Sequence, residues 1–454
     1  MSPAQPSPRL QKLAVRPPHL ASHPDIPTTA PQHESADPPW SPGNLQRAPH
    51  RLAFFLGVVL LVAASAWWLA VHIGRQTWGW SLPAVVSPTL THASMMSLGV
   101  FPVFFAGFLF TAGPKWLGVT PPDARDLMWP LGLQSLGWLV WMVGGALSEE
   151  VALTGLAMAI AGMLHVYLRF LWLVRASLAP DRLHAHLACV AGGLGVVALI
   201  ATWVALWQQR VDLALLSVRT GLWGCVVTTF LLVAHRMLPF FTAHALPGFA
   251  PWRPRWVLWL LMGIAAAEAL ASWAPMLAPQ AWLGARAPGA WMLGWGLAEL
   301  AAGSLVLWLS LTWGLMQSMQ VRLLAMLHVG FTWFGLALAL SGASQLLGLR
   351  HGLPLLGLGA LHALTMGFLG SVLMAMVTRV SSGHSGRPLT ADNLAWWAFW
   401  ALQLATVGRI ASALEQGSAW LTLLAATIWL GVILLWGRRL VRWYGTPRAD
   451  GQPG

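Results

Sequence analysis

From Leu52 onward the chain alternates between long apolar runs and short polar loops. An α-helix rises about 1.5 Å per residue, so about 20 apolar residues cross the roughly 30 Å hydrocarbon core of a bilayer. The pattern therefore predicts an all-α, polytopic transmembrane helical bundle of about 12 spans. The predicted spans cover residues 52–73, 90–113, 128–147, 151–175, 185–207, 213–235, 255–274, 290–314, 321–345, 354–379, 393–412 and 418–437.

The two ends of the chain differ from this pattern. Residues 1–50 are rich in proline, contain few large apolar side chains and carry mixed charge. Such a segment buries too little apolar surface to fold, so we expect a disordered, Pro-rich cytoplasmic tail. Residues 51–442 form the predicted transmembrane helical domain, and residues 443–454 form a short cytoplasmic tail.

Composition places the protein in a membrane rather than in solution. Hydrophobic residues make up 57% of the chain and charged residues 9%, and the mean hydropathy is +0.64. A soluble domain carries about 25% charged residues. The formal net charge of +12 is spread over many loops, one or two basic side chains at a time. This distribution indicates that the partner of the protein is a lipid bilayer and that the protein does not bind nucleic acid.

The loop charges also predict an orientation. With the N-terminal tail in the cytoplasm, ten lysine and arginine residues fall in cytoplasmic loops and five in the opposite loops. Cytoplasmic loops carry the excess of basic residues in membrane proteins, so we expect both termini in the cytoplasm. The five basic residues assigned to the opposite loops are Arg75, Arg210, Arg286, Arg350 and Arg409.

The apolar run from Pro354 to Leu389 holds one histidine, His362, well inside its length. An unsatisfied polar group in lipid costs several kcal/mol, so this imidazole must pair, bind a metal or face a cavity. Small residues beside it allow the close approach of a neighbouring helix or of a flat cofactor, and the run alone leaves both interpretations open. On a helix the stripe that flanks His362 consists of Gly359, Ala363, Met366, Gly370 and Met374.

Other histidines lie inside predicted spans at two depths. His92 and His362 fall in the outer third and His72 at the outer end of its span, whereas His165 and His328 fall toward the inner third. A lone buried histidine is more often structural than a ligand. Several at matching depths favour a cofactor site, because neutral imidazole binds haem iron and copper.

Tryptophan, acidic and cysteine residues further limit the kinds of site that the sequence can form. Many of the 30 tryptophans lie near span ends, Trp68 among them, as an interfacial belt requires. Glu268 and Glu299 are the deep carboxyl groups, with Arg169 and Arg219 as candidate partners. The sequence contains no Cys-x-x-Cys-His, which excludes a covalently attached c-type haem.

One segment resembles a known family. LHALTMGFLGSVLMAMVTRVSSGHSGRPL, residues 361–389, resembles the signature region of the NnrS family of bacterial polytopic membrane proteins that contain haem and copper. AGFLFTAGPKW (106–116), HRMLPFFTAHA (235–245) and MLHVGFTWFGLALALSG (326–342) agree with that family's pattern in spacing and order. The resemblance places His328 and His362 on positions that the family fills with histidine. His384 and Arg387 match its Gly-His-x-Gly-Arg loop, where a basic cluster would bind haem propionates or mark topology.

The second span departs from the family pattern. Relatives open it with His-x-His-Glu-Met, whereas this chain has His92, Ala93, Ser94, Met95 and Met96. The resemblance therefore implies copper less strongly than haem b. Either one metal is missing or Met95 or Met96 replaces the absent imidazole, since a thioether suits Cu(I).

The resemblance implies a bacterial inner-membrane, multi-pass protein that holds haem b, with copper as a further metal, between the second, ninth and tenth spans. It implies a role in the nitric-oxide response or in tolerance during denitrification or nitrosative stress, with nitric oxide as ligand. A haem-copper redox enzyme, with His72, His92 and His362 around the second metal, and a solute transporter with structural histidines stay open as alternatives. The candidate cofactor-binding residues are His362, His92, His328, His384 and Arg387, and the candidate metal ligands are His362, His92, His328, His165 and Met96.

Overall fold

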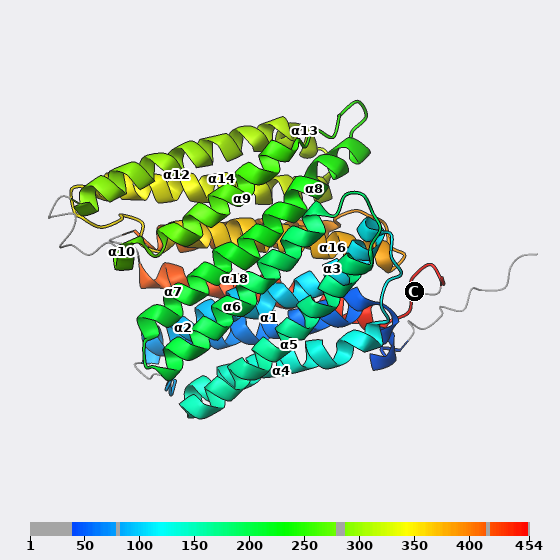
Figure 1. Cartoon of the computed structure of the whole chain (residues 1–454), viewed down its shortest axis with the longest axis horizontal. Coiled ribbons are helices and arrows are strands. Elements are labelled where there is room, and N and C mark those ends of the chain that lie inside the picture. The colour runs from blue at the N-terminus through cyan, green and yellow to red at the C-terminus, as the bar shows by residue number, and fades with distance from the viewer. Residues whose placement is uncertain (1–38, 79–81, 278–286, 415–417, 453–454) are drawn as a thin grey trace, which may run out of the picture. The chain divides into compact units, whose positions relative to one another are not determined.

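The computed structural model describes residues 39–78, 82–277, 287–414 and 418–452. Within these ranges the chain is helical and contains no strand. The long helices run side by side in a bundle (Figure 1). The α-helices are α1 (Pro49–Ile73), α2 (Pro88–Ser94), α3 (Val100–Leu117), α4 (Met128–Leu147), α5 (Glu149–Ala176), α6 (Leu183–Trp207), α7 (Val211–Gly221), α8 (Thr228–Ala245), α9 (Arg255–Ala271), α10 (Ala274–Leu277), α12 (Ala287–Thr312), α13 (Leu315–Ser318), α14 (Arg322–Gly348), α15 (Gly359–His362), α16 (Ser371–His384), α17 (Asn393–Ala411) and α18 (Ala419–Gly445).

Short π-helical segments continue several of these helices. The π-helices η3 (Met95–Gly99), η5 (Leu222–Val227) and η6 (Ala363–Gly370) join α2 to α3, α7 to α8 and α15 to α16. A fourth, η2 (Gly74–Trp78), follows α1. The π-helix is rare and occurs mostly as a single wide turn inside an α-helix, often at a functional site.

Each of the twelve predicted spans coincides with a helix or with a helix continued through a π-helix. Ten of these in the described residues are long and apolar enough to cross a membrane. The predicted spans 255–274 and 393–412 form α9 and α17, which fall short in length or in hydropathy. The protein is therefore an all-helical, multi-pass membrane protein, as the hydropathy pattern predicts.

The folded part of the chain extends beyond both predicted domain boundaries. Residues 1–38 lie outside the described residues, but a 3₁₀-helix, η1 (Pro42–Arg47), precedes α1. The Asn44 side-chain amide donates to the Gly445 carbonyl at 2.7 Å, and Arg51 Nη1 donates to the Thr446 carbonyl at 2.8 Å. Because these bonds join the start of α1 to the end of α18, the first and last helices of the described chain begin and end on the same side of the bundle.

Helices differ in how much of their surface the bundle covers. In the most apolar window of the helix over Pro88–Leu117, 83% of residues are buried, against 22% for α18. The corresponding values are 72% for Gly359–His384 and for Val211–Ala245. The helices that carry His92 and His362 are therefore interior helices. Helices α4 and α5 form one edge of the bundle, and α12 and α14 lie at the opposite edge (Figure 1).

The α4–α5 hairpin is held by glycine contacts between backbones. A Cβ added at Gly155 would lie 2.3 Å from the Trp141 backbone nitrogen, and one added at Gly137 would lie 2.4 Å from the Ala159 nitrogen. Only glycine permits this approach, and such small-residue interfaces are a common means of packing helices within a membrane.

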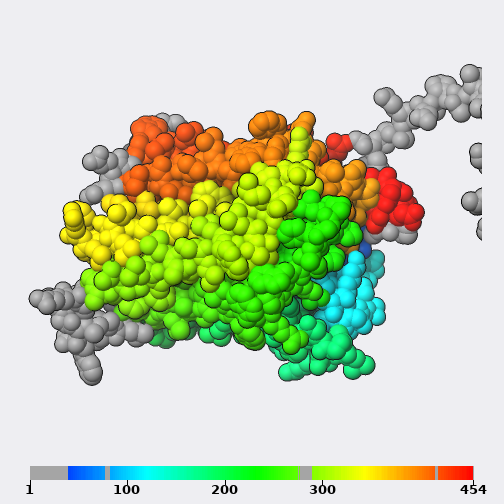
Figure 2. All heavy atoms as spheres, turned by 90° about the horizontal axis from the view of Figure 1, so that it is seen from above, coloured from blue at the N-terminus to red at the C-terminus, as the bar shows by residue number. Residues whose placement is uncertain are grey.

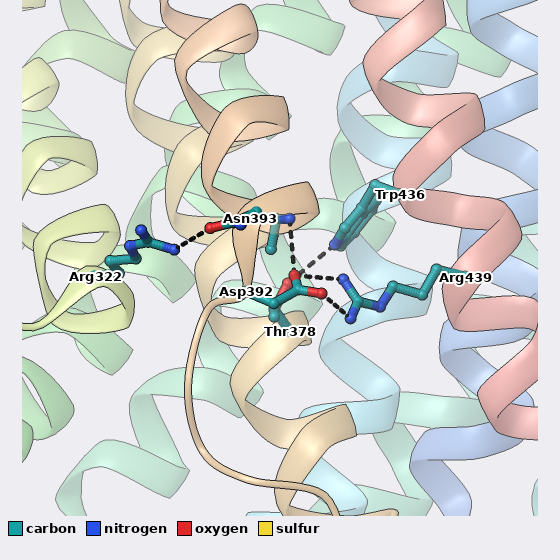
Figure 3. Close-up of polar contacts among 7 residues, drawn as sticks. Arg322, Thr378, Asp392, Asn393, Trp436 and Arg439 are labelled. Carbon is teal, nitrogen blue, oxygen red and sulfur yellow. Dashed lines mark hydrogen bonds and ion pairs between the residues drawn. The ribbon is translucent and has the colours of Figure 1, made fainter.

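Polar contacts join α14, α17 and α18. These contacts lie at the end of the bundle that carries the chain termini. Arg439 on α18 binds Asp392, the N-cap of α17, through two nitrogens (Figure 3). The Arg439 hydrogen bonds, with the Ala395 backbone N–H, lower the pKa of the Asp392 carboxyl below its usual range. Arg322 at the start of α14 donates to the Asn393 side chain at 2.8 Å. On the face shown in Figure 2, α14 lies alongside the orange segment near residue 400.

Candidate functional site

A cavity of about 410 Å³ lies among α1, the helix α2–η3–α3, α7, the helix α15–η6–α16, α17 and α18. Most of its wall is apolar and includes Phe101, Leu373 and Ile433. Trp436 also lines the cavity, and its indole nitrogen donates to Thr378 Oγ1 on α16 at 3.0 Å (Figure 3). The ionisable side chains that line the cavity are His72, His92, His362, Arg219 and Arg409.

His362 is the last residue of α15 and faces this cavity. Its Nδ1 lies 2.9 Å from the Leu358 carbonyl oxygen. A carbonyl only accepts, so in the neutral ring Nδ1 carries the proton and Nε2 keeps its lone pair. Metal-bound histidines almost always have this arrangement, in which the second nitrogen is held by a hydrogen bond.

The π-helix η6 begins directly after His362 and arranges the residues that follow it. Met366, Gly370 and Met374 recur every four residues and line the cavity with His362. Four residues exceed one α-helical turn of 3.6, so this row would drift around a regular α-helix. The wider π-helical turn reduces that drift and keeps the row facing the cavity.

His92 faces the same cavity from α2. Its ring stacks on Trp68 of α1 with centroids 4.0 Å apart and planes 13° apart. His92 Nδ1 is buried and has no hydrogen-bond partner among the described residues. A buried imidazole nitrogen without a partner is costly, and a ligand bound to it would remove that cost. Met96, one turn later, also lines the cavity.

His72, His92 and His362 share the cavity but do not form a metal site by themselves. Trp68 contacts both His72, at a centroid distance of 4.7 Å, and His92. Within the described ranges, no three His, Cys, Asp or Glu side chains are placed to hold one metal ion. A metal bound here would need a donor of another kind, such as Met96 or a cofactor.

His328 and His165 lie away from this cavity. The Thr242 hydroxyl donates to the Leu238 carbonyl, so toward His328 it accepts, and His328 Nε2 carries the proton at 2.8 Å. No residue of α14, the predicted ninth span, lines the cavity, although α14 packs against the helix α15–η6–α16 that carries His362. His165 on α5 accepts a hydrogen bond from Arg169 Nε at 3.3 Å.

His384 and Arg387 lie at the other end of the helix that carries His362. The 22 residues that separate His384 from His362 correspond to about 33 Å along a helix. The His384 ring packs on His50 with centroids 4.7 Å apart, and the Arg387 guanidinium lies 4.8 Å from the Trp443 ring centroid. A haem on His362 would not reach either residue.

The deep carboxyl groups form a pair of their own. The carboxyl groups of Glu268 on α9 and Glu299 on α12 lie close enough to interact, and Ser341 Oγ donates to Glu299 at 2.7 Å. Arg169 is not their partner, because it lies 3.6 Å from Asp126. Arg219 is within electrostatic reach of both carboxyl groups but, among the residues that the structure describes, forms no ion pair with them.

Among the cavity residues that the sequence did not predict as part of a site, three contact the histidines or carry charge: Trp68, Arg219 and Arg409. Trp68 follows the pattern of an interfacial tryptophan, and Arg409 was assigned to an outer loop. Arg219 was considered only as a partner of the deep carboxyl groups. The one signal available in advance was that two arginines lie in apolar helices at the end that should carry few basic residues.

A search of curated proteins found no match to the chain. The family described as NnrS protein matches residues 44–448, which contain every helix of the cavity and all the histidines discussed above. The match covers nearly the whole chain, and the helices have the length and hydropathy of membrane spans. The protein therefore belongs to the NnrS family of membrane proteins of the nitric-oxide response.

Proposed function

We propose that the cavity holds a b-type haem bound through His362, and that this haem is the site at which the protein binds nitric oxide. The observation that carries the proposal is the state of His362. Its Nδ1 is held by the Leu358 carbonyl, and its Nε2 lone pair is left for an iron at the wall of an apolar cavity.

The residues present fit this cofactor in three respects. The cavity volume of about 410 Å³ lies within the range of ligand pockets, about 300–1,000 Å³. Its wall is apolar, with Gly370 and Ala93 allowing close approach. His92 supplies a second imidazole with an unpartnered Nδ1. Haem iron with an open coordination position binds diatomic ligands, and the surrounding polarity and access decide the outcome.

Copper is a smaller part of the proposal. His92 and Met96 lie one turn apart on the same helix and both line the cavity, which offers one imidazole and one thioether. Such a soft donor set favours Cu(I) over harder ions. His328 is proposed to affect copper content or the nitric-oxide response from outside this cavity, because its Nδ1 is buried without a partner.

We further propose that the protein lies in the bacterial inner membrane with both termini in the cytoplasm. The hydrogen bond from Asn44 to Gly445 puts the start of α1 and the end of α18 on one side, and the excess of basic loop residues favours the cytoplasm. A reporter that is active only in the periplasm, fused after Gly454, should stay inactive. A strong periplasmic signal would contradict the orientation.

A visible absorption spectrum of the purified protein, taken before and after addition of nitric oxide, tests the central proposal. We expect a Soret band that shifts on addition of nitric oxide. A solute transporter with structural histidines would show no such band, and that result would overturn the proposal. A haem-copper redox enzyme would also consume nitric oxide when an electron donor is supplied, so the rate of nitric-oxide loss separates binding from reduction.

A further inference from the structure

Two arginines, Arg219 and Arg409, line the cavity together with its three histidines. Arg409 lies near the end of α17, and its guanidinium is within electrostatic reach of all three imidazoles. Arg219 approaches the cavity from α7, about 12 Å along that helix from Val211.

Membrane topology does not explain these two arginines. They lie in the part of the bundle away from the chain termini, which is the side that should carry few basic residues. A charged side chain inside a membrane is costly, so it marks a functional site by default, and its partner must be found.

Ion pairing within the protein does not explain them either. Arg210 and Arg439 form ion pairs with Asp212 and Asp392. In the described part of the chain, no carboxylate lies within ion-pair distance of Arg219 or Arg409. Arg409 Nη1 donates a hydrogen bond to the Ser412 hydroxyl at 3.2 Å.

Arg219 interacts electrostatically with Glu268 and Glu299, and the Glu299 carboxylate has other partners. Glu299 accepts hydrogen bonds from Ser341 and Gln345, and the Glu268 carboxyl group lies beside it. These contacts leave the Arg219 guanidinium available to an anion in the cavity. A guanidinium presents N–H donors in a planar fork, which suits a carboxylate or a phosphate.

The cavity combines an apolar wall, an imidazole that can bind a metal and two guanidinium groups. These features suit a bound molecule that has an apolar body, a metal ion and acidic side groups. We propose that Arg409, with Arg219 as the second cation, binds the propionate carboxylates of a haem held in this cavity. This inference rests on the proposed haem site and deepens it. It assigns to these two residues the role that sequence resemblance suggested for His384 and Arg387.

The test compares haem with its dimethyl ester, in which both propionates have lost their charge. Each compound is titrated into haem-depleted, purified full-length protein, and its affinity is read from the Soret band. We expect Arg409→Gln to weaken haem binding about tenfold or more, the usual effect of losing one charge-assisted hydrogen bond. The same variant should bind the ester as the wild type does. Arg219→Gln should act in the same direction.

Two matched variants control for folding and for charge. Arg409→Lys keeps the positive charge and should retain most of the haem affinity. Arg210→Gln removes an arginine on the same side of the bundle but outside the cavity, where it pairs with Asp212. It should leave both affinities unchanged, which supports a local effect at Arg409.

Several outcomes would overturn the inference. Equal haem affinities in the wild type and in an Arg219→Gln, Arg409→Gln double variant would do so, and would leave the His362 site intact. An equal loss of affinity for haem and ester would show that the arginines act on something other than the propionates, such as a lipid phosphate. If His362→Ala binds haem as the wild type does, the proposed site itself fails and the inference falls with it.

Discussion

The α4–α5 hairpin and the His362 helix both carry small residues at helical spacing, yet they use them differently. Between α4 and α5, an added Cβ at Gly155 would lie 2.3 Å from the Trp141 backbone nitrogen. Along η6 and α16, Met366, Gly370 and Met374 instead border a cavity of about 410 Å³. A stripe of small residues therefore does not by itself distinguish helix packing from a cofactor contact.

What differs between the two regions is the polar group and the local helix geometry. Helices α4 and α5 are regular and approach each other closely through glycine. The other helix carries an imidazole with one nitrogen held by the Leu358 carbonyl, followed directly by a π-helix. An ionisable group beside a π-helical turn is the combination that indicates a site.

The largest effect is expected when the close packing of the hairpin is broken. Gly155→Leu forces a side chain into the backbone of α4, so we expect a loss of about 3 kcal/mol or more of stability, or failure to fold. Thermal unfolding monitored by size-exclusion chromatography measures it. Gly132→Leu on α4 is the matched control, because nothing lies within 4 Å of the added Cβ. Equal behaviour of the two variants would contradict the packing described.

A smaller effect is expected from His92, which lines the cavity from α2. His92→Ala should lower the haem content of the purified protein and shift the Soret band without abolishing it, because His362 still binds the iron. Trp68→Phe keeps an aromatic surface against His92 and should change the spectrum less, since stacking contributes about 0.5–1.5 kcal/mol. A wild-type spectrum and haem content in His92→Ala would remove this residue from the site.

The smallest effect is expected at the exposed end of the bundle, where Arg439 pairs with Asp392. Asp392→Asn keeps the N-cap of α17 and removes the charge, so it should cost about 0.2–1 kcal/mol at neutral pH. The pKa of Asp392 is lowered in the folded protein, so its contribution is present above the usual aspartate pKa. It is lost as the pH falls through the lowered value. Melting temperatures of wild type and variant should therefore converge in acid, and a constant difference would contradict the ion pair.

The sequence predicted the helices of this fold better than it predicted how those helices pack against one another. Twelve helices follow from hydropathy alone, and the similar depths of His92 and His362 predict their shared cavity. Hydropathy does not specify which face of a helix borders a cavity, so it could not show that α14 packs against the His362 helix without lining this cavity. Arg409 and Trp68 were missed because an arginine near a span end also suits a loop, and a tryptophan there also suits an interfacial belt.

The most direct test of the account is the absorption spectrum of His362→Ala beside that of His328→Ala, both purified at wild-type yield. Both substitutions remove an imidazole. His362 lines the cavity, whereas His328 is fully buried on α14 outside it. We predict that His362→Ala abolishes or shifts the Soret band and lowers the haem stoichiometry, whereas His328→Ala keeps both and changes copper content or the nitric-oxide response. A wild-type spectrum and full haem stoichiometry in His362→Ala would contradict the account and leave the His362 helix as a packing motif.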